Sequence, residues 1–248
     1  MGLDVDRCCE VIDREIARLA EVTSGVDPAT PVPTCGDWTV ADLLTHTGEV
    51  FLWAARTVRE QAPARLPRST IDWGVPADPA ALPAWIAGGA STVLESFRDA
   101  DPTVPMWAWG WPKDGSFWPR RMVHEIGVHR ADAELALGLV PTFDPEVAAD
   151  GVDELLDNLP QAATFAPAVA TLRGSGTLDL HAPDAGVSWL VTLVADGFRW
   201  ERTESVGTDV EVTAAAGDLL LALYGRPAPI ELDGDLALWE RWVRDSAI

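Results

Sequence analysis

The spacing of apolar residues changes from a helical to a strand-like pattern near the middle of the 248-residue chain, and this change determines the fold class. In residues 5–23, apolar side chains recur every three or four positions, as they do on one face of a helix. Beyond residue 170, short apolar segments are separated by turn residues, which is typical of strands. The sequence therefore predicts a helical first half and an α/β second half, with the boundary between residues 140 and 170.

The first half contains start and stop signals for several helices. Thr39 is a good N-cap, and Asp42 stands at the third helical position, as in a capping box. Pro119 is favoured at the first position of a helix, and Gly138 is a favoured residue just after one. The helices predicted in this half cover residues 5–23, 40–60, 79–99 and 119–137.

The second half is predicted to combine strands with shorter helices. Strands are expected within residues 175–182, 187–196, 197–204, 208–214 and 228–235. Helices are expected over residues 145–166, 216–225 and 236–245. We therefore expect two domains, a helical domain over residues 1–145 and an α/β domain over residues 146–248.

Composition excludes several classes of function. The formal net charge of −21 should repel nucleic acid and anionic membranes. No apolar run approaches the roughly 20 residues that a membrane-spanning helix needs, and the N-terminus has no apolar segment typical of a signal peptide. The three cysteines include no C-x-x-C pair, which fits a reducing cytosol. We expect a cytoplasmic protein without nucleic-acid or membrane partners.

Residues 121–130, with the sequence RMVHEIGVHR, contain two of the four histidines. The motif is not the zinc-protease signature H-E-x-x-H, because its second histidine comes one residue late. Each residue turns a helix by about 100°, so His124 and His129 point about 140° apart. Glu125 and His129 are four residues apart and share a face, so they can chelate one ion. His124 is interpreted as a packing or surface histidine.

A third metal ligand must come from elsewhere in the chain, and only His46 and His181 remain. His46 lies on the second predicted helix, which can face the fourth helix in an antiparallel bundle. Two histidines and one carboxylate form the ligand set of many catalytic zinc sites, although non-haem iron uses the same set. The alternative is that the three residues are unrelated. Glu49 is either a further ligand or a solvated group, and His181 is interpreted as structural or exposed.

Several other residues have two interpretations. Asp132 could orient a histidine, or it could form a surface salt bridge with Arg130. Cys35 precedes a helix N-terminus, which can activate a thiol, but a small buried residue is the favoured interpretation. Tryptophans crowd the segment before the fourth helix, where they could line a pocket or, more often, pack a loop onto a bundle. These tryptophans are Trp107, Trp109, Trp111 and Trp118.

Three segments resemble the mycothiol-dependent maleylpyruvate isomerase family, within the DinB-like metalloenzymes. The first is CGDWTVADLLTHTGEVFLWA, which contains W-T-V-x-D-L-x-x-H. The second is WPRRMVHEIGVHRADAELALG, which contains H-E-x-x-x-H-R-x-D-x-E. The third is GDLLLALYGRPAPIELDGDLALWERW, similar to the end of the family's C-terminal domain. Many DinB-like relatives carry histidine where Glu125 stands, whereas the maleylpyruvate isomerase branch carries glutamate.

The resemblance implies a DinB-like four-helix bundle followed by a small, sterol-carrier-like α/β domain. It places the family's metal ligands on His46, Glu125 and His129, the residues that helical spacing had already selected. It also implies that Arg226 is a catalytic residue, because a family arginine of the C-terminal domain faces the active site. Such an arginine can bind a substrate carboxylate through two hydrogen bonds. The alternative for Arg226 is a charge at a helix C-terminus.

The family uses mycothiol, a small thiol of actinobacteria, and the composition, rich in Ala, Gly, Pro and Asp with a single lysine, is consistent with that source. Coordination to zinc, or to another divalent metal, would deprotonate the thiol. Its attack on a small electrophilic substrate leads to isomerisation if the thiol is expelled and to conjugation if it is retained; hydrolysis by a metal-bound hydroxide is a third possibility. The alternative function is a non-catalytic metal- or ligand-binding or regulatory protein. A monomer or homodimer is expected.

Overall fold

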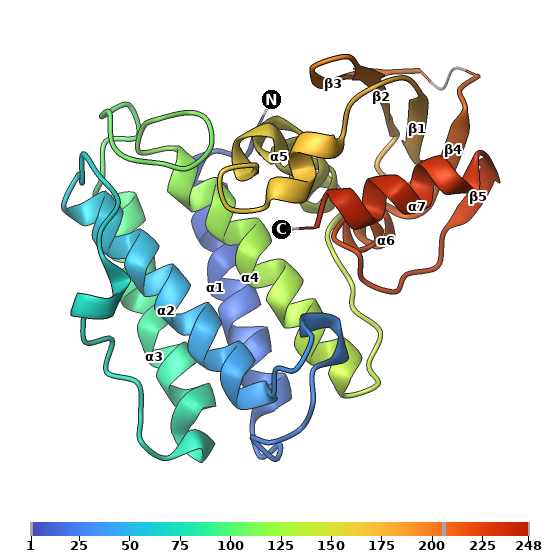
Figure 1. Cartoon of the computed structure of the whole chain (residues 1–248). Coiled ribbons are helices and arrows are strands. Elements are labelled where there is room, and N and C mark those ends of the chain that lie inside the picture. The colour runs from blue at the N-terminus through green and yellow to red at the C-terminus, as the bar shows by residue number, and fades with distance from the viewer. Residues whose placement is uncertain (1, 205–206, 248) are drawn as a thin grey trace. The chain divides into compact units, whose positions relative to one another are not determined.

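The computed structural model of the chain describes residues 2–204 and 207–247. These residues form two compact units, over residues 1–141 and 142–248 (Figure 1). Each unit has its own secondary structure and its own core, and each is described by itself. The predicted fold class, a helical bundle followed by a small α/β domain, is confirmed.

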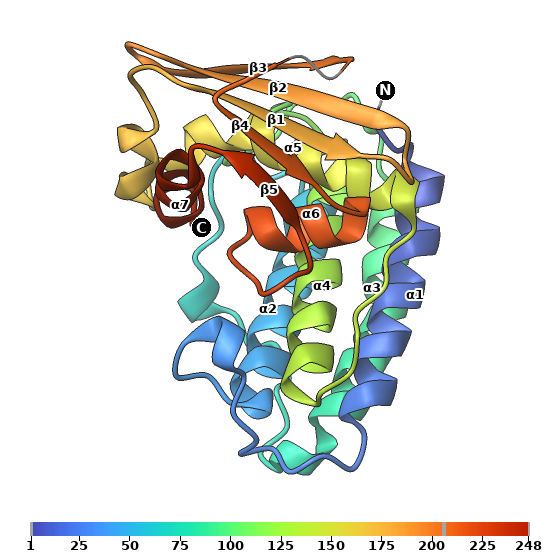
Figure 2. The ribbon, with the colours of Figure 1, turned by 90° about the vertical axis from the view of Figure 1, so that its right-hand side faces the viewer.

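The N-terminal unit is a bundle of four helices that lie side by side in both views (Figures 1 and 2). Short 3₁₀ turns, η1 (Pro33–Cys35), η2 (Arg68–Thr70) and η3 (Pro79–Ala81), interrupt the connecting loops. Apolar faces of the four helices form the core of this unit. The helices are α1 (Val5–Thr23), α2 (Val40–Arg59), α3 (Leu82–Arg98) and α4 (Phe117–Ala136).

Helix α2 begins where the capping signals predicted. The side chain of Thr39 accepts a hydrogen bond from the backbone of Asp42, and the Asp42 side chain accepts one from the backbone of Thr39. Further along α2, Gly48 leaves room for the indole of Trp85 on α3, which would overlap any side chain at this position. The cap fixes where α2 starts, and the close helix contact fixes how α2 packs against α3. Together they determine the position of His46 along the bundle.

Helix α4 begins two residues earlier than predicted, at Phe117 instead of Pro119. Proline is tolerated anywhere in the first turn, because the first N–H groups of a helix have no partner within the helix. Ser116 at the N-cap position turns the chain by bonding to Asp114 through its backbone N–H and its hydroxyl. Pro119 was therefore a correct signal for a helix start but not for its first residue.

The C-terminal unit begins with α5 (Pro145–Ala162), which ends four residues earlier than predicted. Pro167 starts a 3₁₀ turn, η4 (Pro167–Thr171), and disfavours helical geometry at the residue before it. The remaining helices of this unit are α6 (Ala216–Leu223) and α7 (Leu236–Asp245), close to their predicted ranges. Pro167 thus explains why α5 does not extend past residue 166, but not why it ends at Ala162.

A five-stranded mixed sheet completes the C-terminal unit, with the strand order β3-β2-β1-β4-β5. Strands β1 and β4 run parallel and pair Leu178 with Val210, whereas all other neighbours are antiparallel. Trp189 of β2 is fully buried and donates its indole N–H to Asp153 of α5, so the helix is tied to the sheet. The strands are β1 (Thr177–Ala182), β2 (Val187–Val194), β3 (Gly197–Thr203), β4 (Val210–Thr213) and β5 (Glu231–Gly234).

Within residues 2–204 and 207–247, none of the helices combines the length and the apolar character needed to span a bilayer.

Candidate metal centre

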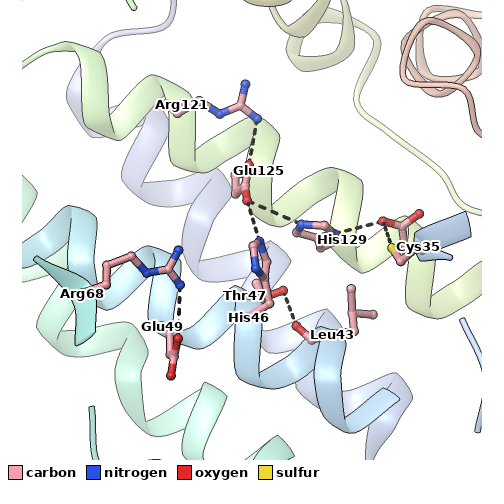
Figure 3. Close-up of polar contacts among 10 residues, drawn as sticks. Cys35, Leu43, His46, Thr47, Glu49, Arg68, Arg121, Glu125 and His129 are labelled. Atoms are coloured by element: carbon pink, nitrogen blue, oxygen red, sulfur yellow. Dashed lines mark hydrogen bonds and ion pairs between the residues drawn. The ribbon is translucent and has the colours of Figure 1, made fainter. Parts of the chain in front are cut away.

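Helices α2 and α4 bring three ligand-type side chains together inside the N-terminal unit (Figure 3). His46 Nε2 lies 3.4 Å from Glu125 Oε1, and His129 Nε2 lies 3.5 Å from the same oxygen. The potential ligand atoms of all three residues lie within 4.8 Å of one another. The i,i+4 pair on α4 and the single histidine on α2 therefore converge, as the helical spacing predicted.

The spacing of these atoms fits a metal ion. With metal–ligand bonds of about 2.0–2.2 Å, two ligand atoms of a tetrahedral zinc lie about 3.3–3.6 Å apart. Both contacts to Glu125 Oε1 fall in this range and exceed the roughly 2.7–2.9 Å of a strong charge-assisted hydrogen bond. Two imidazoles and one carboxylate are also a donor set that zinc prefers. The residues present therefore fit the implied metal.

The three side chains are only partly covered. The exposed fractions are 31% for His46, 23% for Glu125 and 12% for His129. Three protein ligands with one partly open side are typical of a catalytic zinc site, whereas structural zinc is enclosed by four protein ligands. Part of each of the three side chains is therefore in contact with solvent.

Neighbouring positive charges keep Glu125 in its ionised form. Burial alone would raise the pKa of Glu125, but hydrogen bonds to His129 and His46 and the charges of His129 and Arg121 hold it well below its ordinary value. The Arg121 guanidinium donates to Glu125 Oε2 at 3.3 Å and is itself buried. The carboxylate is thus charged and is held from the side opposite the histidines.

The far side of His129 faces a second group of polar residues. Its Nδ1 lies 3.0 Å from Oδ2 of Asp132, and Cys35 Sγ donates to the same oxygen at 3.2 Å. Burial would lower the pKa of His129, but its hydrogen bonds to Asp132, Cys35 and Glu125 raise it well above its ordinary value. Asp132 is fully buried, so a surface salt bridge was the wrong interpretation and the histidine-orienting one agrees with the structure.

Trp38, which was not predicted as a site residue, lies against both histidines. Its ring centroid is 4.8 Å from that of His46 and 6.1 Å from that of His129. Trp38 directly precedes the N-cap Thr39, so the start of α2 also places an indole beside the ligands. Arg121 was likewise missed, although its position four residues before Glu125 was a usable signal.

The other predicted polar residues lie outside the cluster. His124 is buried on α4, which fits the packing interpretation. Glu49 forms an ion pair with Arg68 at 3.2 Å, which agrees with a role other than metal binding. His181 bonds through Nδ1 to Ser188 Oγ at 2.7 Å and is therefore a structural histidine of the sheet. Cys35 is half-buried and donates a hydrogen bond to Asp132, so its favoured interpretation as a small packing residue omitted this contact.

The tryptophan-rich segment mainly packs a loop onto the bundle. Trp118 is buried, stacks on Trp107 and donates its indole N–H to the carbonyl of that residue at 3.0 Å. Trp109 contacts Phe117 edge-on, whereas 56% of Trp111 is exposed. Packing is thus the role shown for three of the four tryptophans.

Arg226 belongs to the C-terminal unit, just beyond α6. Its Nη1 donates to the carbonyl of Tyr224 at 2.8 Å, and its guanidinium lies over the ring of the same residue, 5.9 Å from the centroid. The side chain is half-buried. Its catalytic role stays a prediction.

Fold and site together define a two-domain protein with a His–Glu–His cluster in a helical bundle and a separate α/β unit. The family model "Mycothiol maleylpyruvate isomerase N-terminal domain" matches residues 9–134, and "MDMPI C-terminal domain" matches residues 146–241. The chain belongs to the mycothiol maleylpyruvate isomerase family, which is a family of enzymes. This result confirms the family that the three sequence segments predicted.

Solved structures agree with this assignment at the level of the fold. A crystal structure of the mycothiol-dependent maleylpyruvate isomerase matches with a TM-score of 0.63 and 16% identity, over 94% of this chain and 95% of that chain. A histidine-to-alanine mutant of that enzyme matches with a TM-score of 0.64 and 15% identity, over the same shares. At these identities the likeness shows a shared fold. Comparison with curated proteins gives no match.

Proposed function

We propose that this chain is a zinc-dependent enzyme that uses mycothiol to isomerise or conjugate a small electrophilic substrate. The observation that carries the proposal is the convergence of His46, Glu125 and His129, with both histidines at the spacing of zinc ligands from Glu125 Oε1 and all three side chains partly exposed. Membership of the mycothiol maleylpyruvate isomerase family supports the choice of thiol and reaction class.

The chain's own residues would hold and tune the centre. With zinc bound, His46 and His129 would offer nitrogen donors through Nε2, and Glu125 would offer one negative oxygen while Arg121 contacts its other oxygen. Zinc would supply the positive charge that lowers the pKa of a thiol from about 8.5, so that a thiolate is present near neutral pH. Mycothiol would supply that thiol, the nucleophile that both isomerisation and conjugation require. Trp38 packs against both histidine rings and so limits how far they can turn.

Arg226 is proposed to bind a carboxylate of the substrate. Replacing Arg226 with glutamine removes a charge-assisted hydrogen bond, so we expect the KM for a carboxylate substrate to rise roughly 10- to 100-fold. Steady-state kinetics on the purified variant would measure this rise. The matched control is Arg199→Gln, which removes an exposed arginine of β3 in the same unit. Equal KM values in the two variants would contradict the role of Arg226.

The rival function is a metal- or ligand-binding regulator that keeps the bundle without catalysis. The three-residue ligand set and its partial exposure favour the enzyme, since a purely structural metal is normally enclosed by four protein ligands. We place the proposed enzyme in the cytoplasm of an actinobacterium, because mycothiol is made there, and we expect a monomer or homodimer.

The deciding experiment combines metal analysis with a thiol-dependence assay. We expect about one zinc per purified chain, and turnover of maleylpyruvate or a related electrophile only when mycothiol is added. A chelator should remove both zinc and turnover, and added zinc should restore them. Zinc binding without turnover of any electrophile offered would favour the regulator, whereas a chain that takes up no divalent metal would overturn the proposal.

A further inference from the structure

We propose that Asp132 and Cys35 form a hydrogen-bonded pair that positions His129 as a metal ligand. The inference rests on the proposed zinc centre and concerns the side of His129 that faces away from Glu125. Neither residue would touch the metal or the substrate, so both would be positioning residues. The pair would connect the loop before α2 to the ligand pair on α4.

The two nitrogens of His129 have different neighbours. Nε2 faces Glu125 at 3.5 Å, whereas Nδ1 faces Asp132 at 3.0 Å. A histidine that binds a metal through Nε2 must carry its proton on Nδ1, and a carboxylate is the strongest acceptor for that proton. Asp132 is three residues along the same helix and is fully buried, so it cannot turn away into solvent. The contact therefore fixes both the tautomer and the ring orientation of His129.

Cys35 contacts the same carboxylate oxygen as His129. Its thiol donates to Asp132 Oδ2 at 3.2 Å, across 97 residues of sequence. The loop that carries Cys35 is pinned to the start of α2, because Val32 N bonds to the carbonyl of Trp38 at 2.8 Å and Cys35 N bonds to that of Val32 at 2.9 Å. This loop places Cys35 against the carboxylate that His129 Nδ1 contacts, and it places the indole of Trp38 beside the His129 ring.

A second metal site made of Cys35, Asp132 and His129 is the competing interpretation, since their ligand atoms also lie close together. The distances argue against it. Around zinc, sulfur and oxygen ligands lie about 3.6 Å apart, and nitrogen and oxygen ligands about 3.4 Å apart. The observed separations of 3.2 Å and 3.0 Å are shorter and correspond to hydrogen bonds. Both contacts to Asp132 are also shorter than the 3.4 Å and 3.5 Å contacts to Glu125 in the first cluster.

The test measures zinc affinity by competition with a chromophoric chelator. Second-layer partners of metal-binding histidines typically contribute 10- to 100-fold to metal affinity, so we expect Asp132→Asn to raise the zinc Kd by roughly that factor. A thiol is a weaker donor, so Cys35→Ala should raise the Kd by about threefold, and Cys35→Ser, which keeps a donor, should restore it. The matched control is Glu134→Gln, a buried carboxylate of α4 that pairs with Arg18 and Arg130.

A second readout follows the Nδ1 proton itself. In the zinc-loaded wild type, the Nδ1–H of His129 should give an exchange-protected ¹H–¹⁵N signal, which Asp132→Asn should shift or abolish and Glu134→Gln should leave unchanged. If Asp132→Asn does not fold, Cys35→Ala and Cys35→Ser still decide the question. Wild-type zinc binding with unchanged Kd values in all three variants would overturn the positioning role. Absence of zinc binding in the wild type would instead refute the proposed zinc centre on which the inference rests.

Discussion

Replacing His129 with alanine is expected to remove zinc binding almost completely. The variant keeps only His46 and Glu125, and two protein ligands rarely retain a metal against competing chelators. Because loss of a second-layer partner already costs 10- to 100-fold, loss of a ligand should raise the zinc Kd by more than about 100-fold. Elemental analysis after dialysis and chelator competition would measure the change.

The matched control is His124→Ala. His124 lies on the same helix, is buried and is five residues from His129. We expect this variant to keep its zinc, provided that circular dichroism shows it to be folded. Equal zinc content in His129→Ala and wild type would show that the His–Glu–His cluster is not the metal site.

Replacing Arg130 with methionine is expected to destabilise the N-terminal unit by about 3–5 kcal/mol, because the two buried carboxylates of Glu15 and Glu134 lose their buried partner. They would keep only the exposed side chains of Arg14 and Arg18 as ion-pair partners. Arg130 donates to Glu15 at 2.7 Å and to Glu134 at 2.6 Å, and all three residues are buried. Urea unfolding at constant pH would measure the free energy of unfolding of the variant against the wild type.

Arg56→Met tests whether burial is the cause. Arg56 and Glu60 form a pair with the same i,i+4 spacing and the same 2.6 Å separation as Arg130 and Glu134. Their exposed fractions are 39% and 42%, whereas those of the buried pair are 3% and 5%. Exposed pairs contribute up to about 1 kcal/mol, so Arg56→Met should cost no more than that. Similar losses in the two variants would contradict the explanation.

Much of the candidate site could be predicted because helical geometry is local. The pairing of Glu125 with His129 follows from their i,i+4 spacing alone, and His46 was one of only two histidines left to join them. The start of α2 was likewise predictable from Thr39 and Asp42, whose side chains act on the nearest backbone groups. Each of these predictions needed only the immediate sequence or a simple choice between few residues.

The features that could not be predicted depend on contacts between segments far apart in the chain. Cys35 meets Asp132 only because a loop folds back against α4, and no periodicity predicts the path of a loop. The burial of Arg130 depends on Glu15 of α1, more than 100 residues away. From the sequence alone, Gly48 is only a poor helix former. Its role becomes clear from the structure, where the indole of Trp85 occupies the space that a side chain at position 48 would need.

The anchoring of Glu125 by Arg121 has a consequence for which ion the site would select. One carboxylate oxygen faces both histidines and the other is engaged by the guanidinium, so the group is disposed to bind through a single oxygen. A carboxylate held in this way cannot readily swing into bidentate coordination. Calcium, which takes six to eight oxygen ligands, would therefore be poorly accommodated, and the coordination number would stay low whichever small molecule entered or left.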